Sequence, residues 1–294
     1  MKKYLVCLLI GSAMIRSGYA QQTKLEAAVR QVIRSKQATI GVAVLGPGMN
    51  SPLLIEGEHR FPMQSVFKLP LALTVLQQVD AGKLQLDQRI TIGKKDLQHT
   101  FSKIREKYPD GGILTLEDLL SATVSFSDNN ACDILFRMIG GPEKVTAFIR
   151  AQGIQDIDIV ADEAGMSAAW PVQYQNYSTP GAMLELLEKL HSGSMLSAKS
   201  NAFLLNIMTA GPTGPQRLKA GLPQGTALAH KTGTSMTWNG LTAAVNDAGL
   251  VTLPGNRHFS IVVFVSDSRE KAAVNEAVIA AVAKCAWDNF TLHP

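Results

Sequence analysis

The sequence predicts an α/β (α+β) protein, in which an antiparallel sheet is flanked by the first and last helices and an all-helical domain is inserted into the chain. Segments rich in β-branched and apolar residues occur near both ends, whereas helical patterns fill the middle. We therefore expect a discontinuous sheet domain from residues 21–61 and 211–294, and an all-helical domain from residues 62–210. The cleft at their junction is the expected place for a site.

The first part of the sheet domain is predicted from residue 23 onward. A helical pattern extends to about residue 36, a strand covers Ala38–Leu45, and Leu53–Glu56 follows a Gly-Pro-Gly turn as its hairpin partner. The second part begins with strands at Ala227–Lys231, Leu241–Leu253 and His258–Val265, with a turn at Pro254–Asn256, and ends in a long helix at Glu270–Phe290.

The helical domain is predicted from apolar residues at helical spacing and from capping residues. Thr115 with Asp118 resembles a capping box, and Thr179 before Pro180 is a typical N-cap and first-turn pair. The expected helices are Ser65–Asp80, Leu116–Val124, Asn129–Ile139, Pro142–Ala151, Pro180–His191 and Ala198–Met208.

Residues 1–20 have the pattern of a signal peptide. Lys2 and Lys3 precede an apolar run from Tyr4 to Ile15, and small residues occur just before Gln21. That run is too short to span a bilayer, and no later stretch of 18 apolar residues exists. We expect cleavage after Ala20, export to the periplasm and no membrane association afterwards.

Charge and metal-binding patterns exclude several classes of partner. The formal net charge is +4, and the first 20 residues supply three of these charges, so no basic excess remains for nucleic acid. The six histidines show no His-x-x-x-His spacing and no Cys-x-x-Cys occurs, so we expect no metal and no other cofactor. Cys132 and Cys285 are expected to be buried free thiols, with a disulfide between them as the alternative that an oxidising compartment permits. We expect a monomer that binds a small molecule.

The first chemical motif is Ser65 with Lys68 one helical turn later. Ser65 is predicted to open a helix as its N-cap, and the apolar residues behind it predict that this helix is buried. Burial disfavours an ammonium group, so Lys68 could be neutral and take the proton of the Ser65 hydroxyl. A lone Ser-x-x-Lys is also what an ordinary helix start looks like.

Two further motifs occur in structural contexts that favour a site. Ser127-Asp128-Asn129 stands at the entrance to a predicted helix, and Lys231-Thr232-Gly233-Thr234-Ser235 stands at the end of a predicted strand. Each alone resembles an ordinary cap or turn. The three motifs in this order are the signature of class A β-lactamases and penicillin-binding proteins.

The mature chain resembles the class A serine β-lactamases, and within them the PER-type extended-spectrum subgroup. The stretches that indicate the subgroup are Gln64 before the serine, Ser127–Arg137 and Val172–Asn176. The resemblance implies an exported enzyme that hydrolyses penicillins and cephalosporins, gives antibiotic resistance and needs no cofactor.

The resemblance also implies a role for each motif. Ser65 would attack the β-lactam carbonyl, with its own backbone N–H and that of Thr234 as oxyanion donors. Ser127 would pass a proton to the leaving nitrogen, and Lys231 would hold the substrate carboxylate. The remaining expected substrate contacts are Gln64, Asn129, which can also bond Lys68, Thr232, Ser235, and Gly233, which leaves room for close approach to the strand.

The family's deacylating glutamate matches Glu163. The usual pattern is Glu-x-x-Leu-Asn, but this chain has Met166 and Ser167 in the last two positions. Ser167 is therefore expected to hold the deacylating water jointly with Glu163. The alternatives are a penicillin-binding DD-peptidase, which needs no such carboxylate, and a β-lactam sensor that is acylated once and stops.

Overall fold

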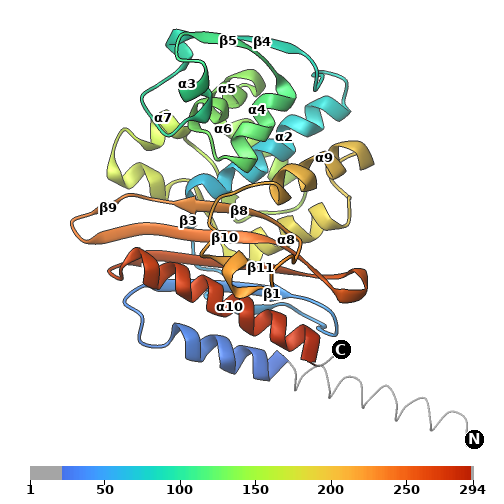
Figure 1. Cartoon of the computed structure of the whole chain (residues 1–294), viewed down its shortest axis with the longest axis vertical. Helices are drawn as coiled ribbons and strands as arrows, with labels where there is room; N and C mark the ends of the chain where they lie inside the picture. Colours follow the sequence, from blue (N-terminus) through green and yellow to red (C-terminus); the bar gives the residue numbers. More distant parts are fainter. Residues whose placement is uncertain (1–21, 293–294) are drawn as a thin grey trace, which may run out of the picture.

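The structure, a computed structural model, describes residues 22–292, so the expected signal peptide lies outside the described residues. An antiparallel six-stranded sheet forms the centre of the sheet domain, with strand order β2-β1-β11-β10-β8 and β9 paired to β10 (Figure 1). Its strands are β1 Thr39–Leu45, β2 Leu53–Ile55, β8 Leu228–Thr234, β9 Thr237–Trp238, β10 Leu241–Leu253 and β11 Arg257–Ser268. The predicted sheet, built from both ends of the chain, is confirmed.

Alternating side chains of the sheet enter two different hydrophobic cores. Val42 and Val44 pack with the N-terminal helix (residues 22–33) and α10 (Ala272–Leu292), whereas Ala43 belongs to the core beneath the middle helices. Successive side chains of a strand point to opposite faces, so a strand buried on both sides needs apolar residues at nearly every position. Figure 1 shows the sheet as a layer between the two terminal helices and the middle of the chain.

The long helices of the middle segment agree closely with the predicted ones, because their ends carry explicit capping groups. Asp128 accepts from the Ala131 N–H to begin α5, and Thr179 caps α8 in the same way. The Thr115–Asp118 capping box is also present. These helices are α2 Lys68–Asp80, α4 Leu116–Ser125, α5 Asn129–Ile139, α6 Pro142–Ala151, α8 Pro180–His191 and α9 Ala198–Thr209.

The segment 62–210 also contains short elements that the sequence did not predict. The strands form two small sheets, β4–β5 and β3-β7-β6, and the helices are single turns. They are β3 Phe61–Pro62, β4 Arg89–Gly93, β5 Gly111–Thr115, β6 Ile157–Asp158, β7 Tyr177–Ser178, α3 Lys103–Lys107, α7 Glu163–Met166, η2 Lys94–Asp96 and η3 Trp170–Tyr174. Runs this short carry too little hydrophobic periodicity to be recognised. Further 3₁₀ turns lie at η4 Leu218–Gly221 and η5 Pro254–Asn256.

Ser65 does not cap a helix as predicted. It lies inside a 3₁₀ turn, η1 (Gln64–Phe67), that continues directly into α2, and no side chain caps either element. Gln64 has a φ of 47°, in the left-handed region that non-glycine residues rarely occupy. The serine hydroxyl is therefore not used in a capping bond and instead accepts a hydrogen bond from Lys68 Nζ.

Both cysteines of the described chain are free thiols, as predicted. Cys132 is fully buried on α5, and burial raises the pKa of its thiol well above the ordinary value. Cys285 on α10 is only partly buried, so the expectation of burial is wrong there. No helix within residues 22–292 has the length and apolar character that crossing a membrane requires.

Gly221 provides a test of how the sheet domain is packed. A Cβ at this position would lie 2.0 Å from the backbone carbonyl oxygen of Ala280 on α10. Gly221→Ala should lower the free energy of unfolding by about 1–3 kcal/mol, because backbone must move to admit the methyl group. Urea unfolding measures this. Gly93→Ala is the matched control, since its nearest contact would be an ordinary 3.5 Å; equal stability of the two variants would contradict the packing.

Candidate active site

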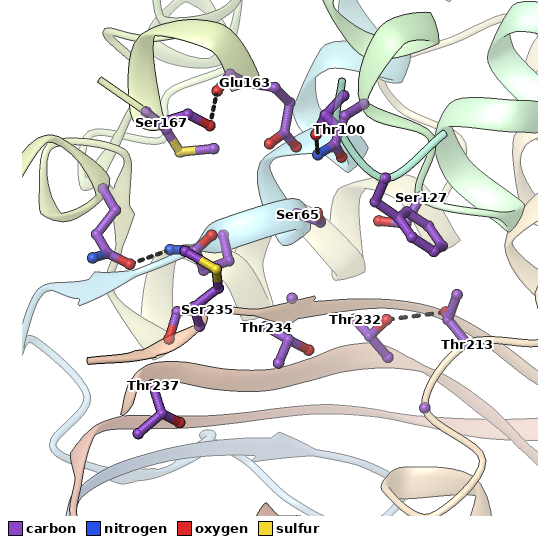
Figure 2. A pocket seen from close by; sticks show the side chains of 18 of the residues that line it. Ser65, Thr100, Ser127, Glu163, Ser167, Thr213, Thr232, Thr234, Ser235 and Thr237 are labelled. Carbon is purple, nitrogen blue, oxygen red and sulfur yellow. Dashed lines mark hydrogen bonds between the residues drawn. The ribbon is translucent and has the colours of Figure 1, made fainter. Parts of the chain in front are cut away.

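A cleft of about 1040 Å³ lies between η1, β8 and the loop that carries Glu163 (Figure 2). That volume is ample for a drug-sized ligand. Ten of the predicted site residues line it: Gln64, Ser65, Ser127, Asn129, Glu163, Ser167, Thr232, Gly233, Thr234 and Ser235. The other two, Lys68 and Lys231, are completely buried beneath it. The structure thus brings all twelve together, from four separate parts of the chain.

Lys68 is the centre of the polar network. Its Nζ donates to Ser65 Oγ at 3.1 Å and to Asn129 Oδ1 at 2.6 Å, and it lies 2.7 Å from Glu163 Oε1. The Ser127 carbonyl oxygen accepts a further bond at 2.8 Å. The Glu163 carboxylate is an ion-pair partner that the expectation of a neutral Lys68 did not include. One amine therefore contacts both the proposed nucleophile and a carboxylate that can exchange protons with it.

Ser127 lies between the two buried lysines. Its Oγ accepts from Lys231 Nζ at 3.0 Å and is 3.5 Å from Lys68 Nζ. Its φ is 59°, a backbone strain of the kind that concentrates at functional sites. The strain is sustained by the next residue, because Asp128 caps α5 and accepts hydrogen bonds from Ser102 and Ile104. The hydroxyl is placed where a proton can pass between a lysine and a bound ligand.

Lys231 lies in the middle of β8 and not at its end as predicted, because the strand continues to Thr234. Its Nζ donates to Ser127 Oγ and, at 2.9 Å, to the Thr232 carbonyl oxygen. Burial and, to a smaller extent, the charge of Lys68 lower the pKa of Lys231 to about 7, and Asp247 and Glu163 oppose this shift. Near neutral pH this lysine can either carry or release its charge.

The hydroxyl groups of β8 and of Ser235, which directly follows it, each have a protein partner. Thr232 Oγ1 bonds Thr213 Oγ1 at 3.0 Å, Thr234 Oγ1 accepts from the Arg217 guanidinium at 2.6 Å, and the Ala244 N–H donates to Ser235 Oγ at 2.9 Å. These bonds fix the direction of the hydroxyls that face the cleft (Figure 2).

Gly233 serves a purpose that the sequence reading missed. A Cβ there would lie 2.4 Å from the Met63 carbonyl oxygen and 3.1 Å from the Val66 nitrogen. The glycine therefore lets the serine-bearing turn approach β8, whatever room it also leaves for substrate.

The loop carrying Glu163 is held by residues that sequence reasoning did not identify. The carboxylate of Asp133 accepts from the Glu163 N–H at 2.8 Å and from the Ala164 N–H at 3.1 Å. Burial raises the pKa of Asp133 to about 7. Gln64 Nε2 donates to Gln173 Oε1 at 2.6 Å, which ties the loop to the residue before Ser65. The amide of Gln64, expected to contact substrate, thus connects the serine-bearing turn to this loop.

Ser167 occupies the expected position one turn after Glu163, but its hydroxyl hydrogen is already used. Ser167 Oγ donates to the Glu163 carbonyl oxygen at 2.9 Å (Figure 2). Only its lone pairs remain to accept a bond from a water molecule.

Arg217 is a second missed residue. It is buried, and its guanidinium donates to the carbonyl oxygens of Gly233 and Asn246 as well as to Thr234, with Glu276 as its ion-pair partner at 3.3 Å. An arginine in an irregular stretch gives no sequence signal for such a role. Over residues 22–292, no group of three or more His, Cys, Asp or Glu side chains is arranged to bind a metal.

Comparison with known proteins places this site in a family. Residues 24–290 match the model of the Beta-lactamase enzyme family. The chain is 42% identical to Beta-lactamase VEB-1 of Pseudomonas aeruginosa, over 98% of both chains. It is 46% identical to Extended-spectrum beta-lactamase PER-1 of the same organism, over 91% of this chain and 88% of the relative.

Solved structures agree with these relatives. TLA-1 extended-spectrum β-lactamase is 46% identical and superposes with a TM-score of 0.89, covering 92% of this chain and 99% of its own. A class A β-lactamase from Bacteroides cellulosilyticus is 35% identical, with a TM-score of 0.88 over 92% of this chain and 99% of its own. The resemblance indicated by the sequence motifs is confirmed: the chain belongs to the class A β-lactamases, enzymes that hydrolyse β-lactams and thereby give antibiotic resistance.

Proposed function

We propose that this enzyme hydrolyses the β-lactam amide through an ester on Ser65, with Glu163 activating the water that cleaves the ester. The observation that supports this best is the shared partner: Lys68 Nζ lies 3.1 Å from Ser65 Oγ and 2.7 Å from Glu163 Oε1. A nucleophile and two groups able to accept its proton are therefore connected before substrate binds.

In the acylation step Ser65 Oγ forms a bond to the carbonyl carbon of the lactam, and the carbon–nitrogen bond breaks. The hydroxyl proton passes to Lys68 or, through it, to Glu163. Ser127, which contacts both lysines, donates a proton to the departing nitrogen and recovers one from a lysine. The backbone N–H groups of Ser65 and Thr234 stabilise the developing oxyanion.

In the deacylation step Glu163 takes a proton from water as the water oxygen attacks the ester carbon. The carbon–oxygen bond to Ser65 then breaks, and Ser65 regains its proton. The hydroxyl hydrogen of Ser167 is already donated to a backbone carbonyl, so Ser167 can only accept a hydrogen bond from this water. Glu163 therefore binds the water more strongly than Ser167 does.

Substrate recognition follows from the cationic end of the cleft. Lys231 and Thr232 bind the carboxylate on the ring fused to the lactam, and Asn129 bonds the amide carbonyl of the side chain. Ser235, expected from the sequence to share the carboxylate, lies at the opposite end of the cleft (Figure 2). PER-1 and TLA-1 are described as extended-spectrum enzymes, which supports oxyimino-cephalosporins as substrates here.

The position of Glu163 favours hydrolysis over the alternatives. A DD-peptidase or a sensor that is acylated once needs no buried carboxylate beside the lysine. In this chain the backbone N–H groups of Glu163 and Ala164 donate to Asp133, and these two bonds hold the Glu163 carboxylate beside Lys68. We further propose that the enzyme is exported to the periplasm after removal of residues 1–20 and works there as a monomer without a cofactor.

The substitution Glu163→Gln separates the two steps. An amide cannot accept the water's proton, so the variant should form the Ser65 ester and release it at least a hundredfold more slowly, the lower end of the range for losing a general base. Mass spectrometry of the intact protein detects the adduct. Ser65→Ala is the control and should form none; rapid turnover by the glutamine variant would assign the base to another group.

The pH dependence of kcat/KM tests Lys231. Because the pKa of Lys231 is lowered to about 7, the cation that binds the carboxylate is present below this pH and is lost above it. kcat/KM should therefore fall on the alkaline side with a midpoint near 7. In Lys231→Arg the charge persists, and the fall should move upward by more than one pH unit. The methyl ester of the same substrate serves as control and should lack this limb; an identical limb for acid and ester would remove Lys231 from recognition.

Export predicts a defined mature N-terminus. Protein recovered from the periplasm of an expressing bacterium should begin at Gln21, which N-terminal sequencing determines directly. Replacing Lys2 and Lys3 by glutamate should leave uncleaved chain in the cytoplasm, because the signal peptide loses its basic region. Activity confined to the cytoplasm of cells making the unaltered chain would refute export.

A further inference from the structure

Two tryptophans from different elements meet at one end of the cleft. Trp170 lies on η3, seven residues after Glu163, and Trp238 lies on β9. Their ring centroids are 5.4 Å apart with an angle of 40° between the planes, and both side chains line the cleft. The pair joins the loop carrying Glu163 to the edge of the sheet.

Trp238 is held in place by a tight hairpin. Trp238 pairs with Leu241 across a two-residue turn, Asn239-Gly240, whose φ values of 50° and 72° are those of a turn that matches the twist of a hairpin. The hydroxyls of Thr237 and Thr242 bond at 2.7 Å across the same strands. Even so, 56% of Trp238 is exposed, so a large apolar ring is fixed in water beside the active site.

Trp170 is tied to the catalytic turn. Gln173 Nε2 donates to the Trp170 carbonyl oxygen at 2.9 Å, and the Oε1 of the same side chain accepts from Gln64, which precedes Ser65. The backbone at Trp170 is therefore linked through Gln173 to the turn that carries Ser65.

The orientation of the substrate decides what reaches these rings. Figure 2 shows Ser65 between two ends of the cleft, with Ser127, Thr213 and Thr232 at one and Ser167, Ser235 and Thr237 at the other. The first end is cationic, because Lys231 bonds Ser127 there. A β-lactam carries its carboxylate and its acylamino side chain on opposite sides of the reacting carbonyl, so the side chain extends to the second end, where β9 begins.

The two tryptophan rings are too close for a substrate ring to insert between them. Such an insertion needs about 7 Å between the outer rings, twice the van der Waals contact distance, and the Trp170 and Trp238 rings are closer than that. The pair can therefore act only as a platform, a surface on which a substrate ring packs from outside. A substrate ring can instead pack on the exposed surface of Trp238. We propose that the Trp170–Trp238 pair binds the aromatic group of the acylamino side chain and so makes the enzyme prefer β-lactams with an aromatic side chain over those with an aliphatic side chain of equal size. The orientation used here rests on the proposed function, in which Lys231 binds the carboxylate.

Three substrates with one cephalosporin nucleus test the platform: phenylacetylamino, cyclohexylacetylamino and acetylamino derivatives. The measured quantity is the ratio of kcat/KM for the phenyl substrate to kcat/KM for the cyclohexyl substrate, which cancels plain hydrophobic burial. Trp238→Leu should lower this ratio by roughly threefold to tenfold, the range expected for loss of an aromatic pair. Trp238→Phe should retain most of it. Ile113→Ala removes an equally exposed apolar side chain on β5, outside the cleft lining, and should change nothing.

Several outcomes would overturn the inference. The first is a ratio near one in the unaltered enzyme, and the second is an equal loss of kcat/KM for all three substrates in Trp238→Leu. The third is a fall in the ratio for Phe101→Leu instead, since Phe101 also lines the cleft and is 56% exposed. The proposed function is judged separately, from formation of the Ser65 ester with the acetylamino substrate. An ester with unchanged selectivity refutes the platform alone, whereas no ester on Ser65 refutes the proposed chemistry.

Discussion

The active site depends on close contact between β8 and the turn that carries Ser65. Gly233 allows the Met63 carbonyl oxygen to approach the strand to a distance that no side chain would permit. The same segment is fixed from behind, because Asn246 Nδ2 on β10 donates to the carbonyl oxygens of Pro62 and Met63 at 2.8 and 3.1 Å. Through this contact the buried end of α2 meets the sheet, and Lys68 and Lys231 come to share Ser127 as a partner.

Two completely buried ammonium groups so near each other would be unstable without compensation, since each loses its hydration and repels the other. The fold places a carboxylate near each of the two lysines. Glu163 contacts Lys68 directly, and Asp247, which is buried and bonded to His230, acts on Lys231 from beneath the cleft. The remaining imbalance appears as the lowered pKa of Lys231. The same burial that makes the site costly to fold also makes its groups reactive near neutral pH.

The sequence predicted the parts of the fold that have long repeats and explicit caps. The bounds of α5, α6, α8 and β10 were predicted to the residue. Asp128, Gly140, Pro142 and Thr179 mark ends of the helices, and the turn at Pro254–Asn256 marks the end of β10. Nine of the twelve site residues lie in three short motifs that retain their order and context, and Gln64, Glu163 and Ser167 were identified only through the family resemblance. Ser65 as an N-cap was wrong, since a 3₁₀ turn and a capped helix begin with the same residue types. Asp133, Arg217 and Trp238 were missed, because their roles arise only when distant segments meet.

The burial of Cys132 has a consequence for how the helical part of the molecule can be followed in solution. This thiol is fully covered within the core that also covers the apolar side of α2, and its raised pKa keeps it protonated, so reagents cannot reach it while α5 stays packed. Cys285, partly buried on α10, offers an internal reference on the other side of the sheet. The rate at which Cys132 is labelled relative to Cys285 thus reports how often the helices separate. Labelling of Cys132 therefore measures local opening of the helical part of the molecule, close to the residues of the active site.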